Sequence, residues 1–241
     1  MSLSDSVGFL LIHGLGGSNK TMTSLAKFLE KKNAKVVNEN LPGHNTKPED
    51  LKMTKWEEWI EFTQTLLDDL KEKCSQVFIV GASLGGIISL FLTATNAEID
   101  GLILCSTAIK PYDLKSWVVH NFPFLHHIIR WVPMKKFTIR FLGVPEDWKI
   151  YEKIPVKSLR EGVEMLKELK PNISKITQPV LILHSIKDKL VPFRATKQIT
   201  STISSADITI AKIDRGGHVI LKDSGCDFAL EKIDNWLSDR I

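Results

Sequence analysis

Short apolar runs alternate along the chain with longer segments in which apolar residues recur at helical spacing. The runs are residues 7–12, 34–37, 76–80, 102–105, 180–183 and 208–213. Strands buried on both faces of a parallel sheet are apolar at nearly every position, as most of these runs are. The segments between them predict helices at about 20–32, 56–73, 84–95, 193–204 and 223–239. This alternation predicts an α/β domain in which helices cover a mostly parallel sheet.

One stretch, residues 110–172, interrupts the alternation because it contains no strand-like run. It is rich in aromatic residues, namely Trp117, Phe122, Phe124, Trp131, Phe137, Phe141 and Trp148. Prolines at positions 111, 123, 133, 145 and 155 predict short helices and turns there. We expect residues 110–172 to form a cap over the carboxyl edge of the sheet, inserted in a core of residues 1–109 and 173–241. An irregular crossover between two strands is the alternative.

The composition limits the classes of protein to be considered. A chain of 241 residues with 43% hydrophobic and 25% charged residues is typical of one globular domain. No apolar run approaches the ~20 residues of a membrane-spanning helix, and the N-terminal segment is expected to be a strand and not a signal peptide. A net charge of +4 does not predict nucleic-acid binding. Three cysteines without a CxxC spacing favour the reducing cytoplasm.

A candidate nucleophile lies in the sequence Gly81-Ala82-Ser83-Leu84-Gly85, between an apolar run and a helical pattern. G-x-S-x-G in a strand–turn–helix context is the nucleophile turn of serine hydrolases, whereas alone it is a weak match. Side chains at Gly81 and Gly85 would clash with the tightly folded backbone. The helix that follows would point its first N–H groups at a substrate oxygen, so the N–H of Leu84 is one predicted oxyanion donor.

A second donor is expected from the glycine-rich loop at residues 13–17, HGLGG, which directly follows the first apolar run. Its backbone can approach a ligand closely. A phosphate-binding loop is disfavoured, because the chain lacks GxxxxGK[ST] there and HGLGG lacks the spacing of GxGxxG.

Seven histidines compete for the role of general base. His218 follows the last apolar run and precedes the last helical pattern, so its imidazole can reach over the sheet edge. The other six are His13, His44, His120, His126, His127 and His184. We expect His13 to brace its loop, His44 to form a hydrogen bond within its turn, and His184 to pack in the core or support the site. The three histidines of the cap lack cysteines or carboxylates at ligand spacing and indicate a metal only weakly.

The acid that orients the base should lie between Ser83 and His218 in the chain, because this order is typical of triads built around such a turn. Asp188 follows the run at 180–183 and is the favoured candidate. Asp214 and Asp223 are alternatives, although a turn and a helix N-cap would explain them equally simply.

Taken together, HGLGG, GASLGG, HSIKDKLVP and GGHVI in this order resemble motifs of the small bacterial carboxylesterases and monoacylglycerol lipases of the α/β-hydrolase superfamily. The likeness covers residues 9–236 and is weakest in the cap. It implies an α/β-hydrolase fold with a mostly parallel sheet of about six to seven strands, helices on both faces and a small helical cap. The N-terminus is too short for the antiparallel strands of larger members.

The resemblance also implies the site residues. Ser83, Asp188 and His218 would form the catalytic triad, and the backbone N–H groups of Leu15 and Leu84 would form the oxyanion hole. No metal or organic cofactor is implied. A nucleophilic serine argues against dehalogenase and epoxide-hydrolase chemistry, in which an aspartate attacks.

These features predict a carboxylesterase that cleaves short- to medium-chain acyl esters or monoacylglycerols through an acyl-enzyme. A thioesterase, a peptidase or a weakly catalytic ligand receptor would use the same fold. The expected partner is a small ester, with no nucleic acid, and the chain would be a monomer or homodimer. The basic and aromatic residues of the cap allow weak contact with a lipid interface, although a solvated basic face explains them better.

Overall fold

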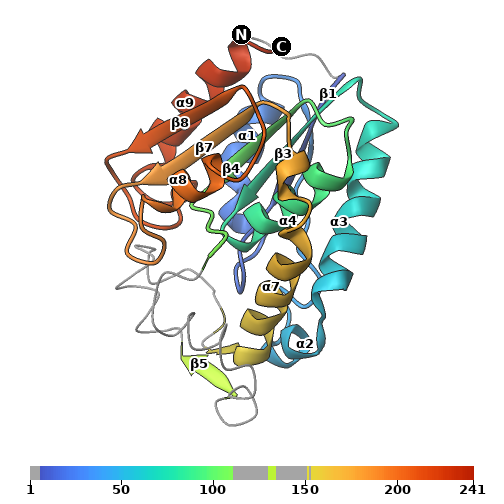
Figure 1. The fold of residues 1–241 in the computed structure, drawn as a ribbon, viewed down its shortest axis with the longest axis vertical. Helices are drawn as coiled ribbons and strands as arrows, with labels where there is room; N and C mark the ends of the chain where they lie inside the picture. The colour runs from blue at the N-terminus through green and yellow to red at the C-terminus, as the bar shows by residue number, and fades with distance from the viewer. Residues whose placement is uncertain (1–5, 111–129, 134–150, 152) are drawn as a thin grey trace.

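The sheet and its strands agree with the apolar pattern. The computed structural model describes residues 6–110, 130–133, 151 and 153–241. Six strands pair in the order β2-β1-β3-β4-β7-β8, and every neighbouring pair is parallel (Figure 1). The strands are β1 (Val7–Ile12), β2 (Lys35–Val37), β3 (Gln76–Ala82), β4 (Gly101–Cys105), β7 (Val180–Ser185) and β8 (Ile208–Ile213). Each predicted run coincides with or overlaps one of these strands, so the predicted parallel sheet is confirmed.

Helices cover both faces of this sheet (Figure 1). The five predicted helices are found within their expected bounds as α1 (Thr23–Glu30), α3 (Trp56–Lys71), α4 (Leu84–Thr95), α8 (Ala195–Thr200) and α9 (Cys226–Ser238). Successive side chains of a strand point to opposite faces. In β3, Val77 and Ile79 accordingly join the cluster packed by α3, α4 and α8, whereas Phe78 and Val80 join the cluster packed by α1 and α9.

Two short strands lie in residues 110–172, where the sequence shows no strand-like run. β5 (Trp131–Pro133) pairs antiparallel with β6 (Lys153–Pro155). Each strand is three residues long and ends at a proline, so neither produces an apolar run that periodicity can detect. Of the seven aromatic residues named above for the predicted cap, the six besides Trp131 lie outside the described residues. The division into core and cap stays a prediction.

A 14-residue helix, α7 (Val156–Leu169), was also not predicted. Pro155 is its N-cap, where a proline ahead of the helix costs no hydrogen bond. Met165 and Leu169 bury this helix against the cluster on the α4 side. The short helix α2 (Pro48–Met53) lies beside α7, since the hydroxyl of Ser158 donates to the carbonyl of Leu51 at 3.1 Å. Two 3-10 turns, η1 (Asn19–Thr21) and η4 (Ile173–Lys175), complete the described elements.

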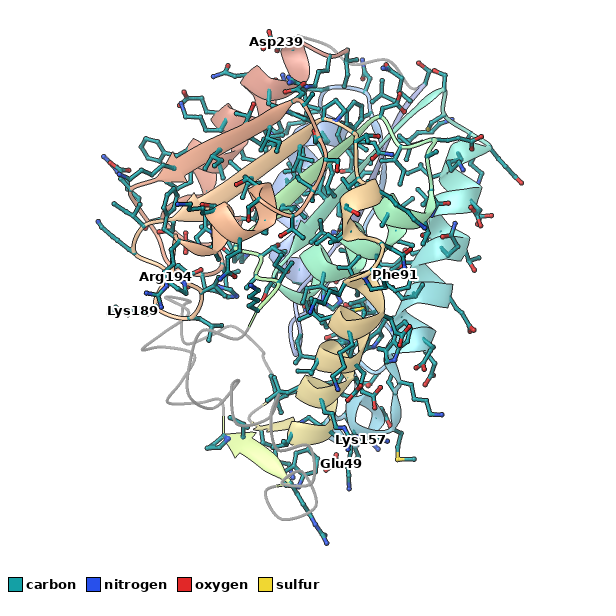
Figure 2. All side chains as sticks on the ribbon, in the orientation of Figure 1. Glu49, Phe91, Lys157, Lys189, Arg194 and Asp239 are labelled. Atoms are coloured by element: carbon teal, nitrogen blue, oxygen red, sulfur yellow. The ribbon has the colours of Figure 1, made fainter. Side chains whose placement is uncertain are left out.

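The carboxyl ends of the six parallel strands meet at one edge of the sheet. The first strand of the sheet is β1. The second strand, β2, pairs with one edge of β1, and the third, β3, pairs with the opposite edge. Ligand sites in open α/β sheets lie where the strand order reverses in this way. Figure 2 shows Lys189 and Arg194 in the segment that follows β7 at this edge, whereas Asp239, beyond α9, lies at the opposite end. The loops after β1, β3, β7 and β8 therefore share one side of the molecule.

Candidate active site

The predicted nucleophile, Ser83, is the single residue between β3 and α4. Its φ of +54° lies in the left-handed region, which few residues other than glycine adopt. A Cβ at Gly85 would collide with the carbonyl groups of Ile12 and His13, and one at Gly81 would collide with the carbonyl of Gly85. The two glycines are therefore required by the close approach of backbone, and the turn presses against the end of β1.

The predicted base, His218, is buried in the loop between β8 and α9. Its Nε2 lies 3.0 Å from the Oγ of Ser83. Asp223, one of the alternative acids, does not orient this ring through a hydrogen bond. Its carboxylate accepts the N–H of Gly217 at 2.6 Å and that of Gly225 at 2.8 Å, so it holds the loop that carries His218. Burial raises the pKa of Asp223, and the other alternative, Asp214, is exposed.

The predicted acid, Asp188, is placed on the far side of the imidazole from Ser83. Its Oδ2 accepts the Nδ1–H of His218 at 2.8 Å, and the Nε2 of His184 lies 3.5 Å from the same oxygen. Its Oδ1 accepts the N–H groups of Leu190 at 2.8 Å and Val191 at 2.9 Å. Burial alone would raise the pKa of Asp188, but His218 and the hydrogen bonds to the carboxylate outweigh it and hold the pKa well below its usual range.

The two predicted oxyanion donors lie in the glycine-rich loop and at the start of α4. The N–H of Gly17 donates to the carbonyl of Gly14 at 3.1 Å, and Gly16 has a φ of +69°, as in a type II turn. The N–H of Leu15, at the second position of this turn, takes no part in the turn's hydrogen bond. Leu84 is the first residue of α4, so its N–H has no partner inside the helix. A Cβ on Gly14 would lie 3.2 Å from the Cβ of Ser83, which places the glycine-rich loop directly beside Ser83.

His13 and His44 support this loop as expected from the sequence. The Nδ1–H of His13 donates to the carbonyl of Gly14 at 2.9 Å, and its Nε2 accepts the N–H of Leu41 at 3.1 Å. The ring of His44 packs edge-on against that of His13, with 4.9 Å between ring centroids. Its Nδ1–H donates to the carbonyl of Pro42. Burial lowers the pKa of His13 to about 4 and that of His44 to about 3, so both are neutral at pH 7.

Tyr151 is a supporting residue that the sequence did not reveal. Its hydroxyl accepts the N–H of Thr46 at 2.9 Å and donates to the carbonyl of Gly43 at 2.8 Å. It thereby fixes the turn that contains His44. No spacing signal could have revealed this contact, because the partners lie more than 100 residues apart in the chain.

The histidines of the predicted cap, His120, His126 and His127, lie outside the described residues. Among the residues that are described, no group of three or more His, Cys, Asp or Glu side chains could hold a metal ion.

The arrangement of Ser83, His218 and Asp188 could activate a serine hydroxyl, and comparison with known families shows which family the chain belongs to. The family model described as serine aminopeptidase, S33 (Hydrolase_4), matches residues 8–225. The chain belongs to this family. The resemblance to α/β-hydrolases inferred from the four motifs is therefore confirmed.

Two curated relatives of this family member have named activities. It is 27% identical over 217 residues to a thermostable monoacylglycerol lipase of Bacillus sp. (strain H-257), covering 90% of this chain and 84% of the relative. It is 26% identical over 235 residues to a carboxylesterase of Bacillus subtilis (strain 168), covering 93% and 92%.

Solved structures show the same fold over the whole length of this family member. One, from work on the metagenome-derived lipolytic enzymes LipS and LipT, has a TM-score of 0.85 at 20% identity and covers 99% of this chain and 96% of the other. The monoacylglycerol lipase of Paleococcus ferrophilus has a TM-score of 0.76 at 18% identity, covering 100% and 97%. The predicted α/β-hydrolase fold is confirmed.

Proposed function

We propose that this α/β-hydrolase cleaves carboxylic esters through an acyl-enzyme, with Ser83 as nucleophile, His218 as base and Asp188 as orienting acid. The observation that carries the proposal is the position of one imidazole between the other two groups. Its Nε2 lies 3.0 Å from the Oγ of Ser83, and its Nδ1 lies 2.8 Å from a carboxylate oxygen of Asp188. These distances match the arrangement by which a serine hydroxyl is activated.

The proposed mechanism starts from the tautomer of His218 that carries its proton on Nδ1. The Nδ1–H of His218 donates to Asp188, which leaves the Nε2 lone pair free to accept the proton of Ser83 as its oxygen attacks the ester carbonyl. The oxygen that gains charge is stabilised by the N–H groups of Leu15 and Leu84, and one such donor contributes about 3 kcal/mol to lowering the barrier. His218 then protonates the leaving alcohol, and a water activated in the same way releases the acid.

The proposed substrates are short- to medium-chain acyl esters or monoacylglycerols. The support comes from the two curated relatives, whose names are monoacylglycerol lipase and carboxylesterase. The family description names an aminopeptidase, which keeps peptide hydrolysis as a second candidate because the same triad attacks amides.

The test is a hydrolysis series on the purified protein. Its substrates are p-nitrophenyl esters of rising acyl length, monoacylglycerols, an acyl thioester and an aminoacyl amide. We expect ester turnover, and we expect Ser83→Ala to reduce it to trace level. More than trace activity in a clean Ser83→Ala preparation would show that Ser83 is not the nucleophile. Faster turnover of the amide than of every ester would instead favour the peptidase.

We also propose a monomer or homodimer in the cytoplasm. The support for a reducing compartment is that Cys74, Cys105 and Cys226 are all free thiols. Among the described residues, no helix is both long and apolar enough to cross a membrane. The residues behind the proposed lipid contact lie mostly outside the described part of the chain. Sedimentation with anionic vesicles at low and moderate salt tests that contact.

A further inference from the structure

The loops that carry Asp188 and His218 separate where β7 and β8 end. The two strands pair in parallel up to Ser185 and Ile213, and the N–H of Ile186 makes one more bond, of 2.9 Å, to the carbonyl of Ile213. Beyond this point β7 continues into the loop of the acid and β8 into the loop of the base. The distance between acid and base therefore depends on contacts made after the sheet pairing has ended.

The side chain of Ser185 makes such a contact. Its hydroxyl donates to the carbonyl of Gly216 at 2.9 Å, with the carbonyl of Arg215 at 3.3 Å, and its oxygen accepts the N–H of Lys187 at 3.1 Å. The side chain is fully buried. A hydroxyl has one proton to donate and lone pairs to accept, so one oxygen atom joins the two loops. The atom links the residue before Asp188 to a residue two positions before His218.

The loop of His218 is stiff enough to transmit this link. Gly216 has a φ of +70°, and a Cβ there would collide with the carboxylate of Asp223. The same carboxylate accepts the N–H of Gly217 at 2.6 Å. The backbone of Gly216 and Gly217 is thus held by Ser185 and by Asp223. A shift at Gly216 therefore moves His218 with it.

We propose that Ser185 is a positioning residue of the catalytic site, whose hydroxyl sets the separation of Asp188 and His218. It touches neither the nucleophile nor the reacting atoms and acts through the two loops. The inference rests on the proposed function of these residues. Without the hydroxyl, the carbonyl of Gly216 and the N–H of Lys187 lose their shared partner, and the imidazole is no longer held in line with both Ser83 and the acid.

The experiment compares three variants of Ser185 with a matched control. Ser185→Ala removes the hydroxyl without adding volume. Ser185→Thr and Ser185→Val add about the same volume to a fully buried site. The two variants differ only in that threonine carries a hydroxyl group where valine carries a methyl group. The control is Ser158→Ala, because Ser158 is equally buried and also donates to a backbone carbonyl, but its partner, Leu51, is in α2.

We expect Ser185→Ala to reduce kcat for a short-chain p-nitrophenyl ester by roughly 10- to 100-fold, with KM within about twofold, because small misplacements of catalytic groups have effects of this size. Ser185→Thr should retain about 10-fold more activity than Ser185→Val. Ser158→Ala should keep kcat within about twofold. If Val does not fold, the comparison of Thr with Ala carries the test.

A second readout does not require turnover. We expect the proton between the Nδ1 of His218 and Asp188, which lie 2.8 Å apart, to give a low-field signal in the ¹H NMR spectrum of the free protein. We expect this signal to move upfield or broaden in Ser185→Ala and to stay unchanged in Ser158→Ala. Unchanged kcat and an unchanged signal in Ser185→Ala, with only a lower Tm, would overturn the inference. Absence of ester turnover in the wild type would instead refute the proposed function, and the NMR comparison would still test the position of His218.

Discussion

At the scale of single residues, burial determines the protonation state of two histidines, His13 and His44, that support the glycine-rich loop beside Ser83. His13 and His44 are buried against each other, and burial holds their pKa values at about 4 and about 3. Neutral His13 donates from Nδ1 to the carbonyl of Gly14 and accepts at Nε2 from the N–H of Leu41. A proton on Nε2 would face that N–H and break the second bond. The glycine-rich loop therefore depends on a histidine that stays neutral.

The same burial predicts how stability depends on pH. The folded pKa values lie below the unfolded value of 6.5, so between about pH 6.5 and 4 the unfolded chain binds more protons. The contribution of the two neutral histidines to the free energy of unfolding is fully present above pH 6.5. It is lost as the pH falls, by up to about 1.4 kcal/mol per pH unit for each histidine. His44→Phe should flatten this dependence. Urea unfolding between pH 4.5 and 7.5 measures it, and parallel curves for wild type and variant would contradict the assignment. The pKa of Asp188 is lowered from 3.8, so its contribution to stability is lost mainly as the pH falls below about 4.

At the scale of elements, the sequence predicted helices and strands whose features lie in adjacent residues. It did not predict contacts between segments that are distant in the chain. The bounds of Val7–Ile12 and Leu84–Thr95 were predicted to the residue. The features that indicate them, an unbroken apolar run and a helical pattern directly after a G-x-S-x-G turn, lie in adjacent residues of the chain. The strand Trp131–Pro133 was missed because its partner lies about 20 residues away and neither segment is an apolar run. In the site, the motifs indicated the serine, histidine and aspartate. They could not indicate Tyr151 or the hydroxyl of Ser185, whose partners are distant in the chain.

Helix α7 offers a prediction at this scale through Gly162. This glycine lies inside the helix, where alanine is favoured by about 1 kcal/mol. A Cβ there would lie 3.3 Å from the Cδ1 of Leu84, the tip of a flexible side chain. We expect Gly162→Ala to raise the free energy of unfolding by about 0.5 kcal/mol, because Leu84 yields at a small cost. Urea denaturation checks this. A destabilised variant would show that α7 is packed too tightly against Leu84 for the side chain to yield.

At the scale of the whole molecule, one sheet carries two hydrophobic clusters. The cluster on the α3 side contains Trp59, and the cluster on the α9 side contains Ile233 and Trp236. Both are built from alternate side chains of the same strands, such as Ile79 and Phe78 of β3. If the strands unfold, both clusters therefore lose their packing together. Ser83, Asp188 and His218 lie in segments that follow the carboxyl ends of those shared strands, so the geometry of the proposed site depends on the packing of both faces.

This sharing predicts that damage on the face away from α3 weakens the whole sheet. Ile233 is fully buried in α9, and Ile233→Ala should cost about 2–5 kcal/mol through lost contacts and the cavity left behind. Hydrogen exchange measured by mass spectrometry should show the slowest amides of α3 and β3 losing protection by the same amount as those of α9, since all exchange through one global opening. A loss confined to α9 would mean that its cluster unfolds independently. A uniform loss would mean that the geometry of the proposed triad shares the stability of the entire sheet, because Ser83, Asp188 and His218 each follow one of its strands.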